Sequence, residues 1–446
     1  MSTPGSADPL GRTVPSVWTR GGEIGAMRPF PRRAFSYRVR AMLIDRLFSP
    51  HTFDEFIRDS WGRRFEYVPG WPGKFAELLP WEALNRILEE HSFDAARLRL
   101  VKDGQHVTRS SYIREQPFAR VVPAALTRHL RDGATLNINR IDQMYGPVGD
   151  LAASLSRVLR EPVSVNLYAG WRTTKGFDLH WDEHDVLVLQ VAGRKHWRVY
   201  GDNRPYPISH ALDGSYPPPE EVVWDGILGE GELLYIPRGW WHVAVPMEEP
   251  SLHLTFGVDV HNGRHLLLWM VDQLCAASAV TRKDLPRFAT AAARAEHVEL
   301  LRQDLLAQLT PDLVDRFYAH LESRARPQQT VGLPWSAMAE GLPPTDDFLV
   351  QLPAARDATL TETPDGRVQL VAAGKRLRLA PSARPIVEPL LQGQPVSIAR
   401  VVAEAAGQVD RDTVRSLLGK LVGQGLVVVA GPAPAAPRAE APLLVS

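Results

Sequence analysis

Cysteine is nearly absent from this chain, and long apolar runs are absent altogether. The 446 residues include one cysteine, Cys275, so no internal disulfide can form and a reducing compartment is expected. The sequence has no stretch of about eighteen apolar residues, which argues against a membrane-spanning helix. The N-terminus also lacks the apolar core of a secretory signal. We therefore expect a cytoplasmic protein with no membrane partner.

Net charge is missing as well. Lysine and arginine together number 51, as do aspartate and glutamate, so the formal net charge is zero and no overall basic field favours nucleic acid. Lysine itself is scarce, because only 7 of the 51 basic residues are lysines. With 44% hydrophobic residues, the chain is long enough to bury a large core in two or three domains.

The chain does contain a His-x-Asp tripeptide, His180 to Asp182, and a third candidate ligand, His242, about sixty residues later. Side chains alternate along a strand, so His180 and Asp182 are expected on the same face. His242 follows an apolar strand at 233–236 and a Pro-Arg-Gly turn, where an antiparallel barrel can bring it opposite the pair. Two imidazoles and one carboxylate form the facial triad of non-haem Fe(II) oxygenases, which leaves positions open for a cosubstrate and O2.

The residues after this tripeptide predict a β-hairpin. An apolar run at 186–189 is followed by a turn at 192–193 and a second strand at 194–200. Alternation on the second strand places Lys195 beside Trp197 on the inner face. A buried ammonium is costly unless an anion meets it, and a dicarboxylate cosubstrate would supply that anion. The alternative is that Lys195 extends past Trp197 to solvent.

The stretches 180–200 and 231–242 together closely resemble the JmjC-type cupin proteins of the ribosomal oxygenase family, and the resemblance covers about residues 41–430. It implies an α+β fold built on a double-stranded β-helix, the cupin or JmjC jelly roll. It also implies Fe(II) as cofactor, 2-oxoglutarate as cosubstrate and O2 as oxidant. The expected reaction is hydroxylation of a protein or peptide side chain, plausibly on a ribosomal protein.

By this resemblance, His180, Asp182 and His242 match the catalytic iron ligands. Lys195 matches the basic residue that pairs with the distal carboxylate of 2-oxoglutarate. Bacterial members that resemble arginyl hydroxylases tend to carry arginine at this position, whereas lysine resembles the eukaryotic histidyl hydroxylase branch. The identity of the target residue therefore stays open.

Three further positions match cosubstrate-binding residues of the family. Asn166 and Tyr168, on the strand before the His-x-Asp tripeptide, match positions that line the cosubstrate pocket, and their spacing of two puts both on one face. Thr255 matches a hydroxyl position that can contact a 2-oxoglutarate carboxylate. His253 shares the face of Thr255, where it either lines the pocket or packs in the core.

The chain outside the barrel divides into segments of distinct composition. A strongly basic start is expected to be a disordered tail, or a transit peptide, and the apolar stripe after the barrel resembles a dimerisation bundle, although it could instead pack on the chain's own barrel. The expected organisation is a basic tail at 1–40, a catalytic domain at 41–262 with its barrel at about 163–260, a helical dimerisation segment at 263–326, a linker and winged-helix-like domain at 327–430, and a disordered tail at 431–446.

The winged-helix pattern invites a DNA-binding hypothesis, which its charge does not support. Residues 381–430 carry five basic and four acidic side chains, so no phosphate-binding surface is expected and a role in protein contacts is favoured. Three functional alternatives stay open. The same chemistry could act on a biosynthetic peptide or small molecule, it could remove N-methyl groups, or the chain could be a non-catalytic metal-binding cupin scaffold.

Overall fold

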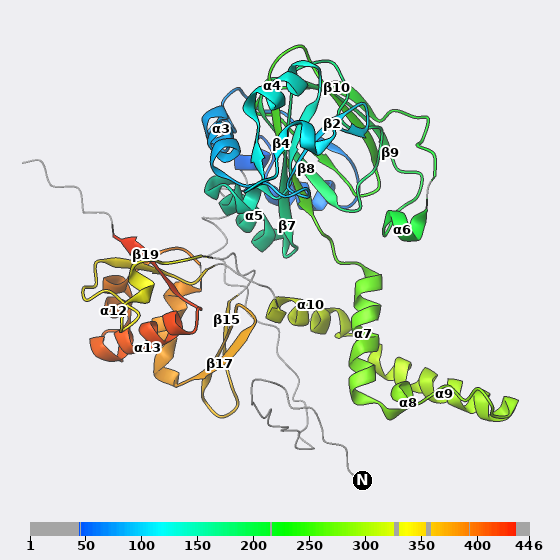
Figure 1. The fold of residues 1–446 in the computed structure, drawn as a ribbon. Coiled ribbons are helices and arrows are strands. Elements are labelled where there is room, and N and C mark those ends of the chain that lie inside the picture. The colour runs from blue at the N-terminus through cyan, green and yellow to red at the C-terminus, as the bar shows by residue number, and fades with distance from the viewer. Residues whose placement is uncertain are drawn as a thin grey trace, which may run out of the picture.

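The computed structural model describes residue 44 and residues 46–214, 216–324, 330–353, 358–391 and 393–433. The predicted tails at 1–40 and 431–446 lie outside the described residues, except for 431–433. Figure 1 shows three successive parts: a region of stacked β-sheets, a helical segment that leaves it through α7, and a smaller C-terminal region of helices and short strands.

Short helices and strands come first in the chain. Thr52 caps helix α2 (Phe53–Asp59), because its hydroxyl accepts the backbone N–H of Glu55 while the Glu55 carboxylate accepts the backbone N–H of Thr52. The other elements of this region are α3 (Trp81–Glu90), α4 (Pro123–Arg131), α5 (Gly146–Leu159), β1 (Glu66–Val68), β2 (Leu98–Lys102), β3 (Gln105–His106), β4 (Ile113–Arg114), β5 (Arg120–Val121) and β6 (Thr135–Ile138). Four of these strands, β1, β2, β3 and β6, belong to the larger of the stacked sheets.

Two antiparallel sheets face each other. The larger has eight strands in the order β1-β11-β8-β13-β7-β6-β2-β3, and the smaller has three in the order β10-β9-β12. Together they give the antiparallel double-sheet architecture expected of a cupin jelly roll. The remaining elements here are β7 (Val163–Gly170), β8 (Asp185–Ala192), β9 (Lys195–Gly201), α6 (His210–Asp213), β10 (Trp224–Leu228), β11 (Leu233–Ile236), β12 (Trp241–Pro246) and β13 (Ser251–Val258).

Strand β8 shows how the core is divided between the two faces of the large sheet. Leu187, Leu189 and Val191 belong to the main core, which the N-terminal helices cover. Val186 and Val188 point the opposite way and pack with Trp197 in a second core between the two sheets. β8 is buried on both faces, and its residues 186–189 are accordingly all apolar, although buried Asp185 and Gln190 belong to the same strand. The space between the sheets is where the predicted site lies.

The predicted hairpin at 186–200 is wrong. β8 and β9 follow each other in sequence, but β8 pairs with β11 and β13, whereas β9 pairs with β10 and β12. Gly193 (φ 61°) turns the chain from one sheet into the other, and a Cβ there would lie 2.1 Å from the carbonyl oxygen of Pro250. Strands distant in sequence decide the pairing of a central strand, and a local pattern does not contain that information.

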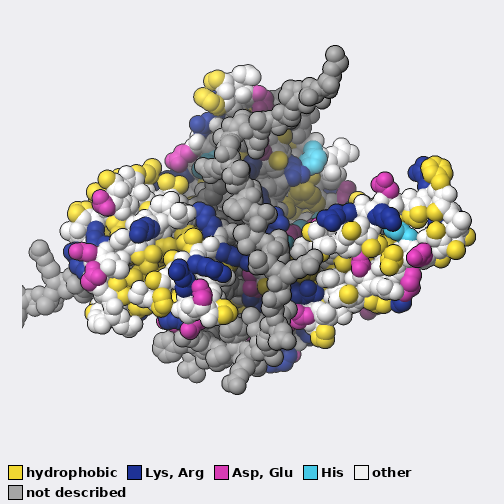
Figure 2. Space-filling model, turned by 90° about the horizontal axis from the view of Figure 1, so that it is seen from below, with side chains coloured by type: hydrophobic (Ala, Val, Ile, Leu, Met, Phe, Trp, Pro, Cys, Tyr) yellow, Lys and Arg dark blue, Asp and Glu magenta, His cyan; other side chains and the backbone are white. Residues whose placement is uncertain are grey.

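Helices follow the sandwich, as the sequence predicts. The segment exposes apolar side chains to solvent, among them Leu267 and Leu268 of α7 and Leu306 of α9. Figure 2 shows hydrophobic and charged side chains intermingled on the surface seen from below. The helices are α7 (Gly263–Ala277), α8 (Ala279–Arg282), α9 (Ala291–Gln308) and α10 (Leu313–Arg324).

The C-terminal region has its own hydrophobic core. Strands β15, β16 and β17 form an antiparallel meander in that order, and a second sheet has the order β18-β14-β19. Across the described ranges, no helix is both long and apolar enough to cross a bilayer. The elements are β14 (Phe348–Gln351), β15 (Thr359–Glu362), β16 (Val368–Ala372), β17 (Lys375–Leu379), α11 (Arg384–Val387), β18 (Val396–Ser397), α12 (Ile398–Ala405), α13 (Arg411–Gly423) and β19 (Val428–Pro432).

Candidate metal centre and cosubstrate cavity

The three predicted metal ligands come together between the sheets. One ligand atom each from His180, Asp182 and His242 lies within 4.8 Å of the others. The Asp182 carboxylate is 3.9 Å from His180 Nε2 through Oδ1 and 3.5 Å from His242 Nε2 through Oδ2. Two imidazole nitrogens and one carboxylate thus converge on one point, which is the donor set of a facial triad.

Backbone hydrogen bonds hold this arrangement in place. His180 and His242 form an isolated antiparallel bridge, in which the backbone N–H of His242 donates to the carbonyl of His180 at 2.8 Å and the reverse bond is 3.2 Å. His242 is the second residue of β12, which follows β11 and the predicted Pro-Arg-Gly turn. His180 and Asp182 precede β8 and do not lie within a longer strand, which corrects the expectation that one continuous strand carries both.

Both imidazoles are oriented through their second nitrogen. His180 Nδ1 lies 2.7 Å from the carbonyl oxygen of Asp178, and His242 Nδ1 lies 3.0 Å from that of Trp240. In the tautomer with the proton on Nδ1, each ring donates its Nδ1–H to the carbonyl oxygen. Both Nε2 atoms are then unprotonated and directed at Asp182. Metal-binding histidines are commonly held in this way, so the residues present fit a metal ion.

The protonation of the ligands also suits a metal. Burial, followed by the charge of His180, lowers the pKa of His242 to about 4, so its ring is neutral near pH 7. Burial acts to raise the pKa of Asp182, but the attraction of His242 and His180 outweighs it and leaves the pKa below its usual value. A neutral imidazole and an ionised carboxylate are the forms that bind metals.

A cavity of about 270 Å³ adjoins the triad, and Lys195 lies in its wall. Lys195 is only 2% exposed, so it points inward beside Trp197, as its strand alternation predicts. Its Nζ is 3.0 Å from His253 Nδ1, and an ammonium can only donate in this contact. Burial lowers the pKa of Lys195 to about 7 and, with the Lys195 charge, holds that of His253 well below its usual range.

The structure distributes the remaining predicted residues over two neighbouring cavities. Thr255 and Tyr168 line the triad cavity, and His253 lines it too, stacked on Tyr168 with ring centroids 4.9 Å apart. Asn166 instead lines an adjoining cavity, where its Oδ1 accepts the backbone N–H of Arg140 at 3.1 Å. Tyr168 belongs to both cavities and therefore lies in the wall between them.

Sequence reasoning missed Phe177. Its ring lies 5.6 Å from that of Tyr168 and 6.3 Å from that of His180, measured between centroids, and it also lines both cavities. Phe177 sits outside any strand, so no alternation pattern could assign its direction. Its position three residues before His180 is the one signal that the sequence offers.

The fold and the triad define a cupin-type sandwich with a facial set of candidate metal ligands. Comparison with known families agrees, because residues 147–266 match the JmjC domain. That range includes the triad, Lys195 and most of the strands that enclose the cavity. The chain therefore contains a JmjC domain, and the family resemblance read from its motifs is confirmed.

Particular relatives extend this result. The chain is 26% identical over 225 residues to the bifunctional lysine-specific demethylase and histidyl-hydroxylase NO66 of Drosophila pseudoobscura pseudoobscura, covering 49% of this chain and 23% of that protein. It is 30% identical over 245 residues to ribosomal oxygenase 1 of Gallus gallus, covering 53% and 39%. The chain thus spans well under half the length of these curated relatives.

A solved structure shares the overall fold. The ribosomal oxygenase YcfD of Escherichia coli, in complex with cobalt and 2-oxoglutarate, has 18% sequence identity and a TM-score of 0.52. The match covers 85% of this chain and 98% of YcfD, and so extends well beyond the JmjC domain. The same protein in complex with cobalt and succinic acid gives the same TM-score.

Proposed function

We propose that this chain is an Fe(II)- and 2-oxoglutarate-dependent oxygenase that hydroxylates a side chain of a protein or peptide. The observation that carries the proposal is the convergence of His180, Asp182 and His242 beside a cavity that contains the buried Lys195. When bound, iron and O2 would supply the oxidising power to convert a C–H into a C–OH group while 2-oxoglutarate is decarboxylated to succinate.

The residues of the chain bind and orient the reactants. The Lys195 ammonium is the proposed partner of the distal 2-oxoglutarate carboxylate, because it is buried and its hydrogen bond among the described residues goes to the His253 ring and not to a carboxylate. Thr255 and Tyr168 line the same cavity and offer hydroxyl groups to the cosubstrate. Val188 and Trp197 complete an apolar wall that limits access of water.

A protein substrate is favoured by the names of the relatives, which describe a histidyl-hydroxylase and ribosomal oxygenases. We propose a ribosomal protein as the first candidate, with the target residue open. Demethylation of an N-methyl group uses the same chemistry, and NO66 is named for both activities. A biosynthetic peptide or small molecule is the alternative substrate, and a non-catalytic metal-binding scaffold is the alternative to an enzyme.

The rest of the chain is proposed to support this activity. The solvent-exposed leucines of α7 and α9 suit a homodimer, and helices α11, α12 and α13 with their flanking strands suit a winged-helix domain. DNA binding is not expected, because five basic side chains between 381 and 430 are balanced by four acidic ones. A cytoplasmic location is in keeping with the single cysteine.

The test is conversion of 2-oxoglutarate to succinate by the purified chain with Fe(II) and ascorbate, with and without bacterial ribosomes. Asp182→Ala and His242→Ala each remove a metal ligand, so both are expected to lower turnover at least about a thousandfold. Addition of a chelator should have the same effect on the unaltered chain. Stimulation by ribosomes would identify a ribosomal substrate.

The matched control is His196→Ala. His196 is one residue from Lys195 but lies on the outer face of β9, where it pairs with Asp225 at the surface. This variant is expected to retain turnover, since surface ion pairs contribute little to stability. Full activity of Asp182→Ala would refute the metal assignment. Tight metal binding without any turnover would favour the scaffold.

A further inference from the structure

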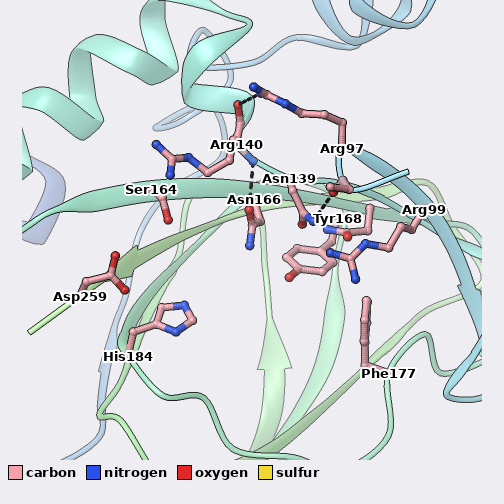
Figure 3. Close-up of a pocket in the computed structure, with 12 residues that line it drawn as sticks. Arg97, Arg99, Asn139, Arg140, Ser164, Asn166, Tyr168, Phe177, His184 and Asp259 are labelled. Atoms are coloured by element: carbon pink, nitrogen blue, oxygen red, sulfur yellow. Dashed lines mark hydrogen bonds between the residues drawn. The ribbon is translucent and has the colours of Figure 1, made fainter. Parts of the chain in front are cut away.

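A second cavity, of about 440 Å³, opens beside the triad cavity and carries an unusual concentration of arginine (Figure 3). Tyr168 and Phe177 line both cavities, so a ligand in the second one lies against the wall of the proposed reaction site. The lining includes Arg97, Arg99 and Arg140 on one side and Asp259 with His184 on the other (Figure 3).

The two cavities are joined by a row of side chains across the large sheet. Arg99 on β2 is paired with Asn137 on β6, Asn137 with Tyr168 on β7, and Tyr168 with His253 on β13. Directly paired residues of antiparallel strands share one face of the sheet. His253 in turn contacts Lys195 from the opposite sheet. The row therefore runs from the proposed 2-oxoglutarate anchor to the arginines.

The arginines lack anionic partners among the described residues, apart from one long pair. Arg97 donates to neutral acceptors, the carbonyl of Arg140 at 3.2 Å and the side-chain oxygen of Gln143 at 2.6 Å. The Nε of Arg99 is buried and has no hydrogen-bond partner. Arg140 pairs with Asp142 at 3.5 Å. A buried guanidinium donor without an acceptor is costly, so this site calls for a ligand that supplies one.

We propose that this cavity binds a carboxylate of the polypeptide substrate, either an acidic side chain or a free C terminus, through Arg99 and Arg97. A carboxylate offers two oxygens to the planar guanidinium fork, which no neutral group matches. Asp259 in the opposite wall disfavours a polyanion such as RNA, since a long phosphate chain would meet a like charge. That the bound carboxylate belongs to a substrate rests on the function proposed above, whereas the existence of the carboxylate site does not depend on that function.

The test is a selection of randomised ten-residue peptides that bind the full-length chain. The peptide library is made in two copies, one with amidated C termini and one with free C termini. Wild-type chain should enrich Asp or Glu in the amidated copy, which indicates a side-chain carboxylate, or bind the free-acid copy preferentially, which indicates a C terminus. Arg99→Gln should reduce this preference at least about tenfold, since hydrogen bonds to charged groups are involved. Arg97→Gln should reduce it to a similar extent.

Two control variants make the result specific. Arg86→Gln removes an exposed arginine from α3 and should leave the preference unchanged. Lys195→Ala should also leave it unchanged, which excludes binding of the acid to the buried lysine. Thermal unfolding of Arg99→Gln, together with Arg99→Lys as a charge-retaining variant, separates lost binding from lost folding.

Equal acidic preference in wild type and Arg99→Gln, or none in wild type, would overturn the proposal. Selection of a single-stranded RNA oligonucleotide over both libraries would overturn it in favour of a nucleic-acid ligand. A chain that selects acidic peptides but never decarboxylates 2-oxoglutarate would support the carboxylate site while refuting the proposed function, so the two failures are distinguishable.

Discussion

At the scale of single residues, Lys195 combines burial with a charge that the proposed cosubstrate requires. Burial lowers its pKa to about 7, so the free protein loses the ammonium as the pH rises above that value. A dicarboxylate binds the charged form. We expect the KM for 2-oxoglutarate to rise above about pH 7, by up to about tenfold per pH unit, as a single protonation would dictate.

The measurement is KM for 2-oxoglutarate across the range from about pH 6 to about pH 9. In Lys195→Arg the side chain stays charged throughout, so the rise should disappear. Lys195→Ala should show a raised KM at every pH. An identical slope in wild type and Lys195→Arg would show that another group titrates.

Tyr235 is a second residue whose role can be tested, this time in stability. Its buried hydroxyl donates to Asp185 Oδ1 at 2.8 Å and accepts the backbone N–H of Gly62 at 2.7 Å. Tyr235→Phe leaves both partners short of a hydrogen bond, so the free energy of unfolding should fall by about 1 to 3 kcal/mol in urea denaturation. Tyr206→Phe, at an exposed ring, is the control and should change little. Equal stability of both variants would contradict the assignment.

At the scale of elements, the crossing from β8 to β9 depends on Gly193. Its positive φ and the 2.1 Å approach of a Cβ to the Pro250 carbonyl mean that alanine is strained in two ways. Gly193→Ala should lower the free energy of unfolding by at least about 2 kcal/mol. Gly62→Ala has a similar φ with no neighbouring atom and should cost less, about 1 kcal/mol. Denaturant titrations measure the free energy of unfolding of both variants. Equal losses of this free energy would show that the contact of the added Cβ with the Pro250 carbonyl is unimportant.

The helices and strands that carry the site differ in how far the sequence alone could predict them. The triad was found because three residues in two short motifs carry it, and the inward direction of Lys195 followed from strand alternation. The crossing at Gly193 was not found, because β8 is placed by β11 and β13, which lie more than forty residues away. Arg97, Arg99 and Arg140 were missed for the same reason. The alternation of β2 places Arg99 opposite its buried leucines, but only the folded sheet shows what lies beside it.

At the scale of the whole molecule, the helical segment bears on assembly. Its exposed leucines on α7 suit burial against a second copy of the chain. We expect a dimer by sedimentation equilibrium, and Leu267→Glu combined with Leu268→Glu should weaken dimerisation at least about a hundredfold by placing charges in an apolar contact. Phe118→Glu alters another exposed apolar side chain, in the loop between β4 and β5, and should leave the mass unchanged. A monomeric wild type would refute the dimer.

The position of the triad has a mechanical consequence for the whole sandwich. His242 belongs to the small sheet, whereas His180 and Asp182 lead directly into β8 of the large one. A metal bound by all three would act as a reversible cross-link between the sheets, in a chain whose single cysteine excludes an internal disulfide. Because the unfolded chain does not present this geometry, a bound metal would stabilise the sandwich by mass action, and metal supply would set its resistance to heat as well as the proposed activity.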